Sequence, residues 1–213
     1  MSTFQESNAS QERPRKKLTI RNPKPTDAIS VHNLIRASAF VDDNSPYLYL
    51  LVCSHFAQTS VVAERNGETV GVITGYIPPA QPDTLFVWQV AVDPMMRRRG
   101  LARAMLKSML LGEACKDVDY IDTSVTADNG ASRKLFTSFA AKLDCPLKES
   151  VLFDRREHFL NLHDSEQLLR LGPFSTTELR KEKDEKLDTS LQPDAPQIKV
   201  AAQNESHKIQ ETS

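Results

Sequence analysis

The sequence predicts an α/β fold in which a mixed, mostly antiparallel central sheet lies between layers of helices. Two observations lead to this class. Strand-like segments follow one another between residues 60 and 92, and helix-like segments alternate with strands after residue 99. Strands joined by short turns pair antiparallel, whereas a helix between two strands favours parallel pairing. The expected order of elements is β α α β β β α β α β.

The first segments are an edge strand and two helices. Residues 18–21 alternate in polarity and stop at two nearby prolines, as an edge strand does. Thr26 caps a helix whose apolar residues return at helical spacing up to Ala39. The polar cluster before Pro46 ends that helix and begins a second one, which runs to Phe56.

A hairpin and a long apolar strand come next. Residues 60–64 and 70–77 flank Asn66-Gly67, a dipeptide that is typical of tight hairpins. Residues 84–92 (TLFVWQVAV) are apolar almost throughout. Such a run predicts a strand that is buried on both faces.

The second half of the chain alternates helices with strands. Amphipathic spacing predicts two helices and alternation predicts two strands, in the order 99–111, 118–125, 129–143 and 148–153. Residues 156–171 are expected to be part-helical and to end at Gly172-Pro173, two strong terminators.

Composition divides the chain into one domain and two tails. Residues 1–16 lack apolar periodicity, and residues 176–213 are rich in Lys, Glu, Asp, Gln, Ser and Pro without an aromatic residue. Such segments cannot bury enough apolar surface to offset the entropy lost on ordering. We therefore expect a domain at 17–175, between a disordered N-terminal tail and a disordered C-terminal tail.

Charge, hydropathy and cysteine usage exclude several function classes. With 27 basic and 28 acidic residues the formal net charge is -1, so no nucleic-acid partner is expected. No apolar run approaches the ~20 residues that span a membrane, and no secretion signal begins the chain. The three cysteines lie outside metal-binding spacings, which indicates free thiols, a cytoplasmic location and no metal.

An anion-binding turn is expected where the long apolar strand ends. Val92-Asp93-Pro94 leads into a short basic loop, and Gly100 begins a helix. Free N–H groups and the dipole at a helix start attract anions, and the small residues Gly100 and Ala102 let a phosphate approach the backbone. Nearby arginines add positive charge. On these features alone, an ordinary turn with a solvated basic loop explains the segment equally well.

This loop resembles the acetyl-coenzyme A (acetyl-CoA) loop of the GCN5-related N-acetyltransferase (GNAT) superfamily, R/Q-x-x-G-x-G/A. The resemblance implies the three-layer GNAT fold, with its sheet splayed at the acetyl-CoA site, and acetyl-CoA as cosubstrate. It also implies acetyl-CoA contacts from the strand and the loop, made by Val90, Ala91, Val92, Arg97, Arg98, Arg99, Gly100, Leu101 and Ala102. The backbone N–H of Val90 would polarise the thioester carbonyl in catalysis.

A second stretch, residues 126–136, resembles the second GNAT motif. There Asn129 would border the pantetheine arm of acetyl-CoA, with Ser132 one turn on, although Asn129 alone also suits a helix cap. Phe136 would contact acetyl-CoA too, but it stands where many GNAT enzymes have a tyrosine that protonates the thiolate. Because that thiolate is a fairly good leaving group, the missing acid need not abolish activity.

Longer stretches resemble one family, the L-2,4-diaminobutyrate acetyltransferases of ectoine biosynthesis, over about residues 18–174. The matching segments are 42–45, 75–92, 151–154, 163–164 and 172–174. The resemblance implies that acetyl passes from acetyl-CoA to the γ-amine of L-2,4-diaminobutyrate. The product would be a precursor of the compatible solute ectoine, made under osmotic stress. It also implies a homodimer.

The acceptor of that reaction carries two amino groups and one carboxylate, so acidic side chains are expected in its pocket. Candidate substrate contacts are Asp42, Asp43, Tyr47, Trp88, His163 and Glu166. By its ordinary pKa, His163 suits a general base, and Glu166 suits an amine anchor or a base acting through water. Arg155 or Arg156 would meet the substrate carboxylate.

Each candidate also has a structural explanation. Asp42 and Asp43 suit a helix cap, Tyr47 and Trp88 suit core packing, and the two candidates beyond residue 160 suit an exposed helix surface. Two other functions stay open. One is a GNAT enzyme that acts on a polyamine, on ornithine or on a protein lysine. The other is a non-catalytic acyl-CoA sensor, which only the loss of tyrosine at Phe136 supports.

Overall fold

The computed structural model of the protein describes residues 18–38, 44–177 and 179–180. Its first compact unit ends at Thr176 and contains every helix and strand named below. The strands are β1 (Leu18–Arg21), β2 (Val61–Arg65), β3 (Glu68–Tyr76), β4 (Thr84–Val92), β5 (Tyr120–Val125), β6 (Leu147–Phe153) and β7 (Glu166–Leu171). The α-helices are α1 (Ala28–Arg36), α2 (Pro46–His55), α3 (Leu101–Leu110) and α4 (Gly130–Lys142).

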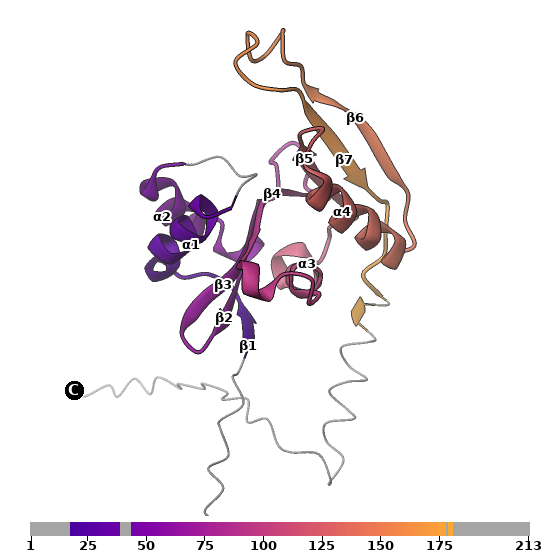
Figure 1. The fold of residues 1–213 in the computed structure, drawn as a ribbon. Coiled ribbons are helices and arrows are strands. Elements are labelled where there is room, and N and C mark those ends of the chain that lie inside the picture. Colours follow the sequence, from indigo (N-terminus) through magenta and orange to yellow (C-terminus); the bar gives the residue numbers. More distant parts are fainter. Residues whose placement is uncertain (1–17, 39–43, 178, 181–213) are drawn as a thin grey trace, which may run out of the picture. The chain divides into compact units, whose positions relative to one another are not determined.

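The strands form one sheet in the order β1-β2-β3-β4-β5-β7-β6 (Figure 1). All neighbours are antiparallel except β4 and β5, which are parallel. The β4–β5 pairing extends only from Thr84–Tyr120 to Val87–Thr123, although β4 continues to Val92. The two strands therefore separate, and the expected mixed sheet with a splayed centre is confirmed.

The hairpin and the long strand have the expected positions. Asn66 and Gly67 both have positive φ, at 56° and 84°, as a two-residue hairpin turn requires. β4 spans the residues that its apolar run predicts. Its expected burial on both faces is wrong at Trp88, which is 37% exposed.

A register shift in β4 explains that exposure. Thr74 of β3 pairs with Gln89, whereas Gly75 pairs with Val87, so Trp88 is an extra residue in β4. Gly75 makes this close fit possible, because a Cβ there would lie 2.9 Å from the carbonyl oxygen of Phe86. A bulge of this kind bends a strand and redirects the side chains that follow it.

The bulge changes which face of the sheet the side chains of β4 take. Gly75, and with it Val87, faces Met109 on α3. Gln89, beyond the bulge, instead reaches Tyr49 on α2. Strict alternation would have put Val87 and Gln89 on the same face.

The expected helical segment at 156–171 is wrong. Residues 166–171 form strand β7, which pairs with β5 on one side and β6 on the other. The segment Gln167–Leu171 lacks β-branched residues, so its propensity favours a helix. Pairing on both edges overrides that propensity, and the sheet gains a seventh strand. Residues 154–165 form the connection between β6 and β7.

One cluster of buried side chains joins α1 and α2 to the sheet. It consists of Ala28, Val31, Leu34, Ile35, Tyr49, Cys53, Val62, Val72 and Ala91. Burial raises the pKa of the Cys53 thiol to about 11, with a smaller contribution from Asp27. This thiol therefore stays protonated at neutral pH and acts as a packing group.

Candidate active site

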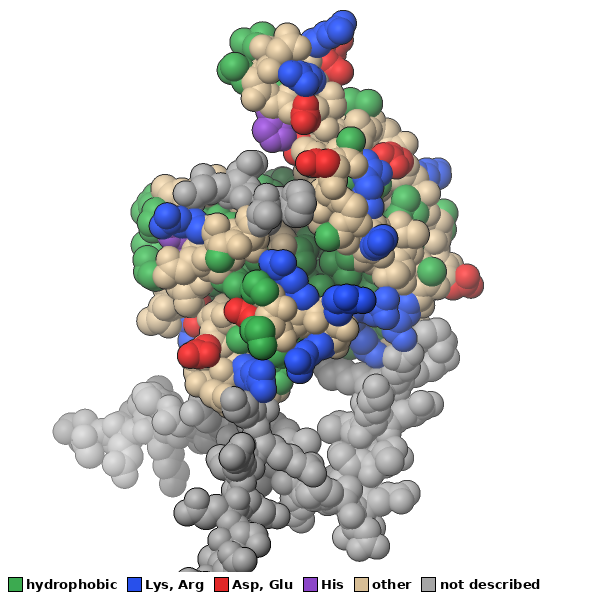
Figure 2. All heavy atoms as spheres, viewed as in Figure 1, with side chains coloured by type: hydrophobic (Ala, Val, Ile, Leu, Met, Phe, Trp, Pro, Cys, Tyr) green, Lys and Arg blue, Asp and Glu red, His purple; other side chains and the backbone are tan. Residues whose placement is uncertain are grey.

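A cavity of about 1150 Å³ opens where β4 and β5 separate. Most of the residues that line it come from the end of β4, the loop into α3 and the start of that helix, the end of β5, α4 and the connection between β6 and β7. Figure 2 shows a hollow with Lys and Arg side chains gathered along its lower border. The cavity therefore has a basic margin suited to an anionic ligand.

The loop before α3 forms the anion-binding part of this cavity. Gly100 is the N-cap of α3 with φ 77°, and no heavy atom lies within 4 Å of the position that a Cβ would take. The guanidinium Nε of Arg97 donates to the carbonyl oxygen of Val92, 3.0 Å away, which ties the basic loop to β4. Phosphate groups of a nucleotide fit beside such an open glycine and free helix N–H groups.

The predicted acetyl-CoA contacts gather here with one exception. The cavity is lined by Val90, Ala91, Val92, Arg97, Arg98, Gly100, Leu101 and Ala102. Arg99 is exposed and does not line it. The second motif also contributes, through Asn129, Ser132 and the buried ring of Phe136.

Asn129 is a helix cap, as predicted, and it also lies in the lining of the cavity, while its contact with acetyl-CoA stays a prediction. Its Oδ1 accepts a hydrogen bond from the backbone N–H of Ser132 at 3.1 Å, which makes it the N-cap of α4. It also lines the cavity. Its side chain therefore stabilises the helix start and borders the ligand space.

The other end of the cavity carries the candidate acceptor residues. Trp88, His163 and Glu166 all line it, although they come from β4, the β6–β7 connection and the start of β7. His163 Nδ1 lies 2.7 Å from the carbonyl oxygen of Asp164, so Nδ1 donates. In the neutral imidazole this leaves Nε2 as a proton acceptor.

Charged side chains of the β6–β7 connection line the cavity together with these residues. Arg155 lines the cavity and pairs with Asp164, Nη1 to Oδ1 at 2.9 Å, whereas Arg156 does not line it. Both members of the pair are exposed. The acceptor end therefore offers carboxylates and one guanidinium, which matches a ligand that has ammonium and carboxylate groups.

The structure does not place three of the predicted substrate contacts in the cavity. Tyr47 is 66% exposed on α2 and does not line it. Asp42 and Asp43 lie outside the residues that the structure describes. Their roles stay predictions.

Sequence reasoning missed several residues of this site. Gln89 lines the cavity because of the β4 bulge, which no local pattern announces. Arg103 and Lys134 also line it, each within the first turns of a helix that begins at a recognised motif. Arg103 follows Gly100 by three residues, so helical spacing could have identified it, whereas Lys134 follows Asn129 by five and has no such signal.

Comparisons with known proteins agree with this geometry. The sequence model of the acetyltransferase (GNAT) family matches residues 28–140. An L-2,4-diaminobutyric acid acetyltransferase of Methylotuvimicrobium alcaliphilum is 42% identical over 161 residues, which cover 76% of this chain and 94% of the relative. An L-2,4-diaminobutyric acid acetyltransferase of Streptomyces anulatus is 44% identical over 161 residues, which cover 75% of this chain and 92% of the relative. The chain belongs to the diaminobutyrate acetyltransferase family.

A solved structure of this family gives the same fold. It is the diaminobutyrate acetyltransferase of Paenibacillus lautus, in complex with its substrate L-2,4-diaminobutyric acid and coenzyme A. The two chains are 38% identical with a TM-score of 0.72, covering 75% of this chain and 97% of that one. As a GNAT enzyme of this family, the protein uses acetyl-CoA as cosubstrate.

The described residues contain neither a membrane-spanning helix nor a cluster of metal-binding side chains. No helix among them is both long enough and apolar enough to cross a membrane. Within the same ranges, no three His, Cys, Asp or Glu side chains gather so that they could hold a metal ion.

Proposed function

We propose that this protein transfers the acetyl group of acetyl-CoA to the γ-amine of L-2,4-diaminobutyrate. The observation that carries the proposal is one cavity whose lining combines an open, basic loop with aromatic and acidic side chains. The open Gly100 and the basic loop suit the phosphates of acetyl-CoA, and Trp88 with Glu166 suits a small cation. The product would be N-γ-acetyl-2,4-diaminobutyrate, the ectoine precursor.

Charge complementarity supports an orientation for the acceptor. Glu166 would bind the α-ammonium group, and Arg155 would bind the carboxylate after exchanging its exposed pairing with Asp164. An exposed ion pair of this kind contributes only about 0–1 kcal/mol, so exchange with a substrate carboxylate is cheap. The indole of Trp88 would form the wall between the two ends.

The proposed transfer is a direct attack of the amine on the thioester. The γ-amine loses a proton to His163 Nε2 or to water, its lone pair forms the N–C bond, and the C–S bond breaks to release the thiolate of coenzyme A. The Val90 N–H would stabilise the developing negative charge on the carbonyl oxygen. Phe136 has no proton to give, so solvent protonates the departing thiolate.

Exposed apolar side chains on β6 and the following connection support a homodimer. Val151, Phe153, Leu160 and Leu162 are all exposed, and Leu162 reaches 89% while lining the cavity. Contiguous exposed apolar surface of this kind commonly marks an interface. Sedimentation equilibrium tests this: wild type should be dimeric and Leu160→Asp monomeric, and a monomeric wild type contradicts the dimer.

We further propose that residues 17–175 suffice for activity, and that the enzyme works in the cytoplasm. Free cysteines support a reducing compartment. A chain that ends at residue 175 should retain the kcat and both KM values of the full chain. A large loss in any of them would show that residues 176–213 belong to the working enzyme.

Acceptor preference is the direct test of the proposed function. Purified protein is mixed with acetyl-CoA and L-2,4-diaminobutyrate, L-ornithine, L-lysine or spermidine, and thiol release is followed. We expect the highest kcat/KM on diaminobutyrate, and mass spectrometry of the product should locate the acetyl group on the γ-nitrogen. Preference for spermidine would favour a polyamine acetyltransferase, and binding of acetyl-CoA without turnover would favour a sensor.

A further inference from the structure

Gln89 is a buried side chain whose carboxamide oxygen has no hydrogen-bond partner among the described residues. It is 4% exposed, and its Nε2 donates to the hydroxyl of Tyr49 at 3.4 Å. Its Oε1 is buried and has no hydrogen-bond partner in the part of the chain that the structure describes. Buried carbonyl groups are nearly always paired, so this oxygen requires an explanation.

The surroundings of Gln89 hold it in place. Its backbone N–H donates to Thr74 Oγ1 at 3.2 Å, at the bulge in β4. Tyr49, which binds the amide nitrogen, is fully buried in the core cluster under α1 and α2. These two contacts anchor the backbone and the amide nitrogen of Gln89, and neither involves its oxygen.

Its position relates Gln89 to the acceptor end of the cavity. Gln89 lines the cavity, as does Trp88, its neighbour at the bulge in β4. The carboxylates that line the cavity come from other parts of the fold: Asp128 from the loop before α4, Asp164 from the β6–β7 connection and Glu166 from the start of β7. The strand thus supplies a neutral hydrogen-bond acceptor, and these other parts supply carboxylates.

This division matches the two nitrogens of a diamino acid. The α-nitrogen stays protonated, and a carboxylate is a suitable partner for it. The attacking nitrogen must be neutral, because an ammonium group has no lone pair. A carboxylate beside it would raise the pKa of the amine and keep it protonated, whereas a carboxamide oxygen accepts an N–H bond with much less preference for the charged form.

We propose that Oε1 of Gln89 accepts a hydrogen bond from the γ-amine of L-2,4-diaminobutyrate and directs its lone pair toward the thioester. The inference rests on the proposed function and deepens it, because it names the contact that the reacting nitrogen makes. Binding of the acceptor then gives the orphan oxygen its missing partner.

Two substitutions in the full-length enzyme test this contact. Gln89→Met keeps the length of the side chain and removes the acceptor oxygen, so kcat/KM for diaminobutyrate should fall about 10- to 100-fold. The KM for acetyl-CoA should stay within about twofold. Gln89→Glu puts a carboxylate beside the amine, so the acidic limb of the kcat profile should move to higher pH by roughly one unit or more.

A purely structural Gln89 gives different results. Loss of packing lowers the unfolding midpoint and affects both substrates alike, but it does not move the pH profile of kcat. An unmoved pH profile of kcat in Gln89→Glu, or an unchanged kcat/KM in Gln89→Met, overturns the inference. The proposed function still stands in that case if the wild-type enzyme acetylates diaminobutyrate. Wild type that is inactive on diaminobutyrate overturns the proposed function itself.

A measurement on the wild-type enzyme covers the case in which the variants fail to fold. The side-chain amide of Gln89 is followed by ¹⁵N NMR in protein saturated with coenzyme A, while diaminobutyrate is added. We expect its resonance to shift in a saturable way, with the same midpoint as diaminobutyrate binding measured by calorimetry. A resonance that stays constant at saturation contradicts the contact.

Discussion

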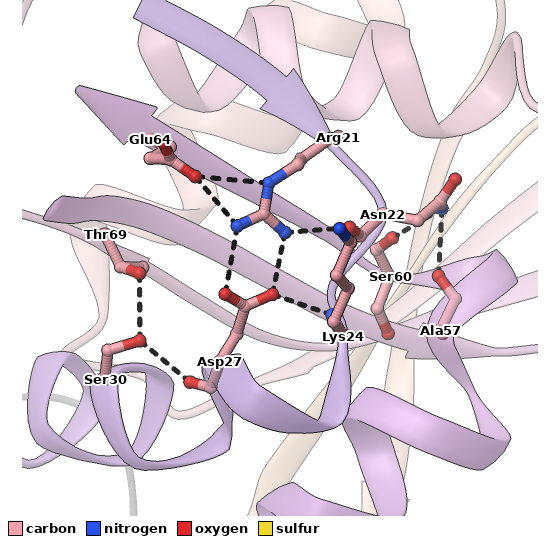
Figure 3. Close-up of polar contacts among 9 residues, drawn as sticks. All are labelled: Arg21, Asn22, Lys24, Asp27, Ser30, Ala57, Ser60, Glu64 and Thr69. Atoms are coloured by element: carbon pink, nitrogen blue, oxygen red, sulfur yellow. Dashed lines mark hydrogen bonds and ion pairs between the residues drawn. The ribbon is translucent and has the colours of Figure 1, made fainter. Parts of the chain in front are cut away.

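Arg21 donates two hydrogen bonds to the carboxylate of Asp27, at 2.7 Å to Oδ2 and 2.9 Å to Oδ1. The same guanidinium donates to Glu64 Oε2 from Nη2 at 2.8 Å (Figure 3). It thereby joins β1 to β2 and to the turn before α1. The hydrogen bond from Arg21 is the main reason that the pKa of Asp27 lies below its ordinary value, and burial opposes it.

This network predicts acid sensitivity of the fold. Because the folded-state pKa of Asp27 is lowered, its contribution is complete above the unfolded pKa of about 3.9 and is lost as pH falls below it. Asp27→Asn should therefore reduce the free energy of unfolding by about 1–3 kcal/mol at pH 7, and by less at pH 3. Urea unfolding at both pH values measures this. The exposed Asp117→Asn is the control, and a difference that does not change with pH contradicts the prediction.

The close fit at Gly75 predicts a second effect on stability. In Gly75→Ala the new Cβ would lie 2.9 Å from the carbonyl oxygen of Phe86 and 3.0 Å from that of Thr59. We expect a loss of about 1–3 kcal/mol in thermal or urea unfolding. The KM for diaminobutyrate should rise more than that for acetyl-CoA, because the bulge carries Trp88. Gly130→Ala, where no atom lies within 4 Å, should keep its stability.

The open glycine at the start of α3 predicts a specific loss of acetyl-CoA affinity. Gly100→Val should raise the KM for acetyl-CoA at least about tenfold, since the side chain would occupy the space for a phosphate. Positive φ alone should cost about 1–2 kcal/mol of stability. Gly67→Val is a matched control, because Gly67 also has positive φ with open space around it but lies in the β2–β3 hairpin. Equal KM changes in both variants would rule out the cradle.

The two roles of Asn129 can be separated. Asn129→Ala removes the N-cap of α4 and should cost about 0.5–2 kcal/mol of stability. Asn129→Asp keeps the oxygen that accepts from Ser132, so its stability should stay near wild type. The added negative charge should nevertheless raise the KM for acetyl-CoA. If Asn129→Asp leaves that KM unchanged, Asn129 is a cap only.

Glu166 provides the charge test at the acceptor end. Glu166→Gln removes the proposed partner of the α-ammonium, so the KM for diaminobutyrate should rise by about tenfold or more. The KM for acetyl-CoA should change little. The exposed Glu157→Gln on the neighbouring connection does not line the cavity and serves as the control. Similar changes in both KM values would indicate a structural role for Glu166.

Most of the fold and the acetyl-CoA end of the site follow from local patterns. The Asn66-Gly67 turn, the apolar run of β4 and the glycine before α3 each determine a local geometry, and the structure has all three. Strand β7 does not follow from its sequence, because pairing with two neighbours outweighs helix propensity. The site at Gln89 is missed for a related reason, since the bulge depends on contacts that β3 makes.

The extra residue in β4 also has a consequence for engineering. Trp88 and Gln89 are adjacent in the chain and both line the cavity, so a library at two consecutive codons samples two neighbouring positions of its lining together. The basic loop and Gly100, which are proposed to bind the phosphates of acetyl-CoA, lie beyond Val92 and would be left untouched. Selection for a longer or shorter diamine can therefore start from this dipeptide, with the donor half of the enzyme unchanged.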